Sequence, residues 1–164
     1  PAQAAATIIA HVTDGVALAR QYRLPRRIDD FILEHHGTMI TRYQFNKAIE
    51  AAGGNASKVD KENFRYPGPR PRSRETALLM LADGVEARAR AERPQDEEAL
   101  RKVVLSTIES AQKQGQFDNT QLTLRDLSII TESFVNVLRG THHPRVSYPK
   151  EESAVTNVLT APRK

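Results

Sequence analysis

Apolar residues recur at three- and four-residue steps through most of the chain, the spacing that places them on one face of a helix. The first such run predicts a helix from about Ala2 to Tyr22 that contains His11. Pro25 favours the start of a second helix, since proline is tolerated in a first turn, and Gly37 favours its end. The doublet His35-His36 is therefore predicted at the end of the second helix.

The same periodicity predicts a third helix over about Met39 to Ala51 and a fourth from the cap Ser73 to about Ala91, with Asp83 in its middle. Leu78 and Leu79 count among the apolar positions of the fourth helix. Residues 55–72 between these helices carry three prolines and little apolar periodicity, so they are expected to form a long loop. Loops of this length in a compact domain are usually functional or mobile.

Two more helices complete the predicted fold. Pro94, followed by acidic residues, favours the start of the fifth, which Gly115 ends. Thr123 and Asp126 have the spacing of a capping pair for the sixth, which runs to Leu138. No alternating strand pattern is present, so the sequence predicts an all-α bundle of about six helices.

Length and composition favour one domain that contains its own core. We expect the domain to cover residues 1–149 and residues 150–164 to form a flexible tail, because the stretch from Thr141 is polar and contains prolines. Charged residues interrupt every apolar stretch, so no segment is expected to span a bilayer. The net charge of +4 favours an anionic partner such as a nucleotide, a nucleic acid or a lipid headgroup, without choosing among them.

Four side chains that can bind a metal lie on or beside apolar faces of three predicted helices: His11, His35, His36 and Asp83. Buried imidazole and carboxylate groups are costly unless a metal or mutual hydrogen bonds compensate them. The chain has no cysteine, so a metal would be held by nitrogen and oxygen, as zinc, iron and manganese can be. Spacing leaves both interpretations open, a metal site and a hydrogen-bonded polar core.

Two further features stay ambiguous at this stage. Asp14 follows His11 by three positions, where it could orient the imidazole or lie in solvent. The segment Lys58 to Arg74 interleaves basic residues with Phe64 and Tyr66, which suits phosphates and bases, although a solvated basic loop has the same composition. A lid beside the substrate and a plain surface loop are both compatible with it.

Several strings, taken in order, resemble the cytoplasmic HD domain of the seven-transmembrane HD phosphodiesterases, and PgpH-type cyclic di-AMP hydrolases are the nearest match. The resemblance covers about residues 1–149. The strings that carry it are HVTDGVALA, FILEHHGT, YPGPRPRSRE, MLADGVEA, LTLRDL and HPRVSYP.

The resemblance implies an all-helical domain on the cytoplasmic side of the bacterial membrane that uses two metal ions, iron or manganese, to hydrolyse cyclic di-AMP to the linear dinucleotide. It implies His11, His35 and His36 as ligands of one metal and Asp83 as a ligand of the other. Tyr66 falls in the loop that the family has beside the active site. We expect Arg70 and Arg74, in the same basic segment, to contact substrate.

The chain also departs from the family pattern, since the family's first histidine and its adjacent His-Asp pair do not precede His11. The resemblance therefore implies a partial HD domain with impaired activity, whose partners are a cyclic dinucleotide and the upstream and membrane-spanning segments of a longer protein. A non-catalytic module that binds a cyclic nucleotide and signals is the alternative. Nucleic-acid binding through the basic segment rests on charge alone and is not expected.

Overall fold

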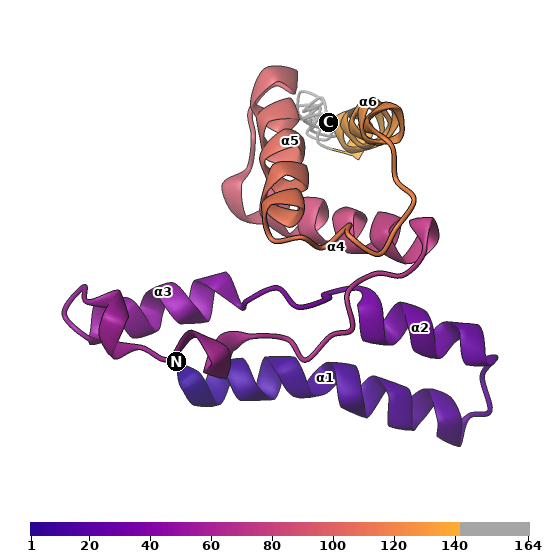
Figure 1. Ribbon diagram of the computed structural model, residues 1–164. Coiled ribbons are helices and arrows are strands. Elements are labelled where there is room, and N and C mark those ends of the chain that lie inside the picture. The colour runs from indigo at the N-terminus through magenta and orange to yellow at the C-terminus, as the bar shows by residue number, and fades with distance from the viewer. Residues whose placement is uncertain (142–164) are drawn as a thin grey trace, which may run out of the picture.

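The structure of the protein is a computed structural model that describes residues 1–141 (Figure 1). It confirms the predicted all-helical fold with six α-helices among the described residues. Their bounds are α1 Ala2–Gln21, α2 Arg26–Glu34, α3 Arg42–Ala51, α4 Arg74–Glu92, α5 Glu97–Lys113 and α6 Leu124–Thr141. The predicted tail, and the histidines at positions 142 and 143, lie outside the described residues.

The helices form two halves. In the first half α1 packs against α2 and α3, and in the second half α5 packs against α4 and α6. Contacts between α2 and α4 join the halves, which lie one below the other in the view of Figure 1. A cluster of buried apolar residues fills the second half, and all of its members come from α4, α5 and α6, with Leu81, Val104 and Val135 fully buried.

The third helix starts at Arg42, three residues later than predicted. Residues 39–41 are extended instead, because they pair with the segment that precedes α4. The N–H of Thr41 donates to the carbonyl of Phe64 at 2.7 Å, and the N–H of Tyr66 donates to that of Met39 at 2.9 Å. Pairing between residues so far apart in the sequence leaves no local signal. The apolar periodicity therefore predicts a helix that begins too early.

The long segment between α3 and α4 is more ordered than a polar loop. It contains two short 3₁₀ helices, η1 Ala56–Lys58 and η2 Lys61–Phe64. Phe64, Tyr66 and Pro71 are buried, and η2 packs against α1 and α3. The aromatic residues of this basic segment therefore belong to the core of the first half.

The predicted helix caps are present. The Ser73 hydroxyl accepts from the N–H of Thr76, and Asp126 accepts from the N–H of Thr123 at 2.9 Å. The inward face of α4 differs from the prediction, because Leu78 and Leu79 are about two-fifths exposed while Leu81 is buried. Leu78, Leu79 and Leu81 cannot all point to one face of a helix, and Leu81 is the one on the face that packs against α5.

By length and composition α1 is apolar enough to cross a membrane, with a mean hydropathy of 1.2, contrary to the expectation from its interrupting charges. Core helices of folded domains pass the same test. Here α1 packs against α2, α3 and η2 and buries Ala5, Val12 and Val16 against them.

Candidate metal centre

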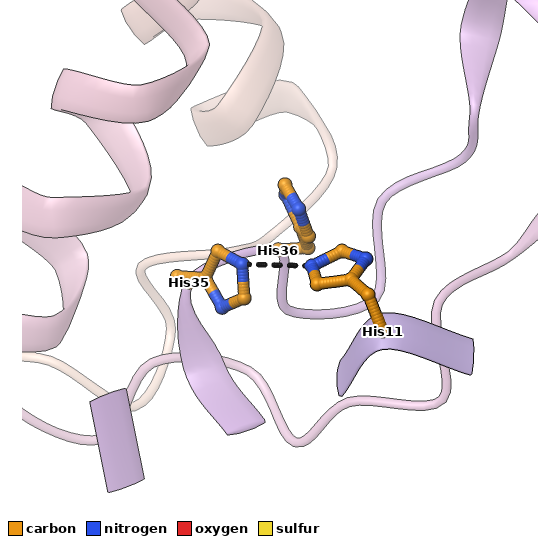
Figure 2. A group of neighbouring side chains, drawn as sticks. All are labelled: His11, His35 and His36. Carbon is orange, nitrogen blue, oxygen red and sulfur yellow. Dashed lines mark hydrogen bonds between the residues drawn. The ribbon is translucent and has the colours of Figure 1, made fainter. Parts of the chain in front are cut away.

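Three imidazoles meet where the end of α2 passes α1 (Figure 2). His11 comes from the middle of α1, His35 is the residue that caps α2, and His36 follows it. The ring centroid of His11 lies 5.2 Å from that of His35 and 5.0 Å from that of His36. The helix end explains how two adjacent residues reach one point, because the backbone turns away there.

Two of these rings have their protonation pattern fixed by the backbone. Nδ1 of His35 lies 2.7 Å from the carbonyl oxygen of Ile32, and Nδ1 of His11 contacts the carbonyl oxygen of Ile8. A carbonyl can only accept, so each Nδ1 carries a proton and donates it. In a neutral imidazole the other nitrogen, Nε2, then has an exposed lone pair.

Nε2 of His11 and Nε2 of His35 are 3.1 Å apart, which is a hydrogen bond if one of these rings carries a second proton and otherwise brings two lone pairs together (Figure 2). Two acceptors at this distance repel unless a cation lies between or beside them. Metal-bound imidazole nitrogens lie about 2.0–2.1 Å from the ion, which places neighbouring ligand nitrogens roughly 3.0–3.4 Å apart. One ligand atom from each of the three histidines lies within 4.8 Å of the others, so the residues fit a bound divalent cation.

His36 is partly buried, with 23% of its side chain exposed. Its ring stacks on Tyr66 with centroids 4.2 Å apart and 22° between the planes. Burial, with the neighbouring His35 and His11, lowers the pKa of His36 to about 3. The ring is therefore neutral near pH 7, and its contact with Asp83, 3.6 Å from Nδ1 to Oδ2, is not an ion pair there. Neutral imidazole is the form that binds metals.

Tyr66 and Asp83 complete the site. Burial, and next the negative charge of Asp83, raise the pKa of Tyr66 to about 12. The phenol therefore keeps its proton and can donate a hydrogen bond to an anion. The Asp83 carboxylate comes from α4, so the site joins the two halves of the molecule.

A buried carboxylate holds the histidine doublet in place. Glu34, which precedes His35, is 1% exposed. It accepts from the N–H and the Nε of Arg72, each at 2.8 Å, and from the hydroxyl of Thr76 at 2.6 Å. These bonds tie the end of α2 to the start of α4.

A second buried side chain holds the turn after the doublet. The Oε1 of Gln116 accepts from the N–H of Thr38 at 3.0 Å, and its Nε2 donates to the Thr38 hydroxyl at 2.9 Å. Gly37, which lies between His36 and Thr38 in the chain, has a φ of +50°, and a Cβ there would come within 2.2 Å of Gln116 Oε1. The close approach and the positive φ both require glycine.

The structure brings together His11, His35, His36, Asp83 and Tyr66, but it places the other predicted site residues differently. Asp14 is exposed, and Nδ1 of His11 bonds to a backbone carbonyl instead. Arg70 pairs with Asp118 at 2.9 Å, and Arg74 pairs with Asp126. These arginines therefore face the turn before α6 and the start of α6.

The sequence analysis missed Glu34 and Gln116. Glu34 carries a weak signal, because an acid among Phe31, Ile32 and the histidines interrupts the inward stripe of α2. Gln116 carries none, since a glutamine after a helix-ending glycine has the composition of an exposed turn.

No family model matches the chain. The chain is 35% identical, over 90% of its length, to the cyclic-di-AMP phosphodiesterase PgpH of Bacillus subtilis, and 39% identical, over 93%, to an uncharacterized protein of Synechocystis. It spans about a fifth of the length of these curated relatives. The crystal structure of the Listeria monocytogenes PgpH HD domain in complex with cyclic di-AMP matches with a TM-score of 0.80, at 29% identity.

That structural match covers 90% of this chain and 68% of the Listeria chain. The chain belongs to the PgpH-type HD domains. A second structure of the same Listeria domain gives a TM-score of 0.77. The predicted family and helical fold are thereby confirmed, and the cluster of histidines in this PgpH-type HD domain has the chemistry of a metal centre.

Proposed function

We propose that this chain supplies one metal site, and part of a second, to an HD phosphodiesterase domain that hydrolyses cyclic di-AMP to its linear dinucleotide. The observation that carries the proposal is the pair of facing Nε2 atoms of His11 and His35, with both Nδ1 atoms on backbone carbonyls. The substrate is that named for the Bacillus and Listeria relatives.

In this proposal His11, His35 and His36 hold one ion and Asp83 contributes to a second, with iron or manganese as the metals. Bound divalent ions polarise a phosphodiester and lower the pKa of a bound water. The protein supplies neutral imidazoles, and the protonated Tyr66 donates to a non-bridging phosphate oxygen. Arg70 and Arg74 can reach the substrate only if their ion pairs with Asp118 and Asp126 break.

The chain contains no His-Asp pair, so the remaining ligands of the second ion are proposed to come from outside these 164 residues. The upstream and membrane-spanning segments of a longer protein are the proposed partners, and the cytoplasmic side of the membrane is the proposed location. The missing pair also favours the second candidate, a non-catalytic module that binds the cyclic dinucleotide and signals.

A chimera separates the two candidates, with this chain replacing the matching segment of Bacillus PgpH. We expect it to bind Mn²⁺ and to convert cyclic di-AMP to linear dinucleotide, because the host supplies the other ligands. The double variant His35→Ala, His36→Ala removes two proposed ligands and should lose more turnover than the roughly 10–100-fold that loss of a hydrogen-bond partner of a metal ligand costs. The matched control is Glu109→Ala, Lys113→Ala, which removes an exposed ion pair on α5.

Turnover is measured by chromatography of the nucleotides, and Mn²⁺ binding by calorimetry. A folded chimera that binds cyclic di-AMP without cleaving it would favour the signalling module. Equal Mn²⁺ binding by the chimera and its His35, His36 variant would contradict the metal site itself.

A further inference from the structure

A cleft of about 460 Å³ lies between α3, α4 and α5, beside the metal centre but lined by other residues. α3 packs against α1 and η2, which leaves its opposite side facing the second half of the molecule. The apolar part of the lining comes from Met39, Ile40 and Ala87. A volume of this size is within the range of small-molecule sites, about 300–1,000 Å³.

Arg42 is the positive group of this cleft without a carboxylate partner among the described residues. Its Nη2 donates to the hydroxyl of Ser110 at 2.9 Å, which bridges the cleft from α3 to α5. A hydroxyl is a neutral acceptor. A phosphate or carboxylate in its place would accept a charge-assisted bond, which is roughly twice as strong.

The other charged residues of the cleft balance one another. Arg88 pairs with Glu92, 2.7 Å from Nη2 to Oε1, and its Nη1 donates to the hydroxyls of Ser106 and Thr107. The lining therefore carries a net charge of +1, located at Arg42. This favours an anionic ligand bound at one end of the cleft.

The lining next to Arg42 suits a flat ring. Tyr43 lies at the cleft and is 69% exposed, and Asn46 follows one helical turn after Arg42. An exposed tyrosine ring offers a stacking face to any base, and a side-chain amide offers both a donor and an acceptor to a base edge. An aromatic group and an anion are thus accommodated side by side.

We propose that this cleft binds a nucleoside monophosphate, with the phosphate at Arg42 and Ser110 and the base on Tyr43 above the apolar lining. Gly84 lines the cleft and follows Asp83 directly, so the ligand would lie next to the metal centre without using its ligands. The proposal does not depend on the proposed hydrolysis, because none of the proposed metal ligands lines the cleft.

The test is calorimetric titration of the full chain with AMP in the presence of a chelator. We expect binding that weakens at least tenfold in Arg42→Gln and is unchanged in Arg90→Gln, a matched control that removes an exposed arginine paired with Glu86 on α4. Inorganic phosphate and adenosine should each bind at least tenfold more weakly than AMP. Tyr43→Ala should weaken binding of AMP and leave that of phosphate unchanged.

The proposal would be overturned by no binding of AMP at millimolar concentration, by equal binding by the Arg42 and Arg90 variants, or by phosphate binding as tightly as AMP. Arg42 and Tyr43 are exposed, and circular dichroism verifies that their variants fold. The variant His35→Ala, His36→Ala should still bind AMP. Loss of AMP binding there would place the nucleotide at the metal centre and contradict the cleft, whether or not the hydrolytic function holds.

Discussion

Glu34 lies next to His35 in the chain, and its carboxylate holds three donors in the interior. A buried carboxylate is costly without such donors, and here the backbone of residue 72, the Arg72 guanidinium and the Thr76 hydroxyl supply them. Arg72 is itself about half exposed, so the pair is only partly screened from water. The main role of the pair of Glu34 and Arg72 is to fix the position of the end of α2, which carries the two imidazoles.

Replacing Glu34 by alanine should lower the free energy of unfolding by about 2 kcal/mol, because buried donors lose their acceptor. Glu50→Ala is the matched control, since Glu50 is an exposed helical glutamate paired with Lys47, and we expect it to cost less than about 0.5 kcal/mol. Urea unfolding followed by circular dichroism measures both. Equal losses in the two variants would mean that the buried carboxylate contributes no more than a surface one.

At this scale the sequence predicts which side chains form the centre, but not what holds them. Histidines and an aspartate on apolar faces of separate helices are visible as a pattern. The partners of Glu34 lie 38 and 42 residues further along the chain, so no local pattern reveals them. The ion pairs of Arg70 and Arg74 span 48 and 52 residues and were hidden for the same reason.

Among the helices, the ends were the most predictable features. Caps depend on residues three positions apart, so Ser73 and the pair of Thr123 and Asp126 could be located from the sequence alone. The start of α3 could not, because the pairing of residues 39–41 with residues 64–66 overrides the helical pattern. Local chemistry determines a cap, whereas tertiary pairing determines where an amphipathic stretch stops being helical.

Asp126 links the cap of α6 to α4 through Arg74, and it makes stability depend on pH. Hydrogen bonds from the backbone and side chain of Thr123, and then the charge of Arg74, lower the pKa of Asp126. A lowered pKa in the folded state stabilises the fold above the ordinary aspartate pKa of about 3.9, and this stability is lost as pH falls through the folded pKa.

Asp126→Asn should therefore be less stable than the parent chain at pH 7, and the difference should shrink as the pH falls below about 4. Urea midpoints of both proteins at a series of pH values between 7 and 2.5 measure it. A difference that stays constant over this range would show that the charge of Asp126 does not contribute.

For the whole molecule, the candidate metal centre and the proposed nucleotide cleft join the same two halves. His11, His35 and His36 belong to the first half and Asp83 to the second, while the bond from Arg42 to Ser110 joins α3 to α5. The resemblance had implied that Asp83 meets the histidines, whereas the bond from Arg42 to Ser110 could not be foreseen, because it depends on where α3 lies relative to α5. Ligands at the two sites would favour the same placement of the halves.

Saturation with AMP should therefore raise the affinity for Mn²⁺, by about fivefold or more, and Mn²⁺ should raise the affinity for AMP by the same factor. Calorimetric titrations of each ligand with and without the other measure both factors. AMP also binds Mn²⁺ directly in solution, and the variant Arg42→Gln is the control for this. In that variant the direct binding persists, whereas any effect of AMP through the protein should be abolished. Identical Mn²⁺ affinities with and without AMP would mean that the two sites are independent.

The distribution of the apolar core has a consequence for how the molecule fluctuates. Its largest described buried cluster lies entirely within α4, α5 and α6, whereas three of the four proposed metal ligands belong to α1 and the end of α2. Partial opening of the first half leaves that cluster intact, so it requires less free energy than global unfolding. Access to the partly buried His35 and His36, and release of whatever they hold, can therefore proceed through a brief local opening while the rest of the domain remains folded.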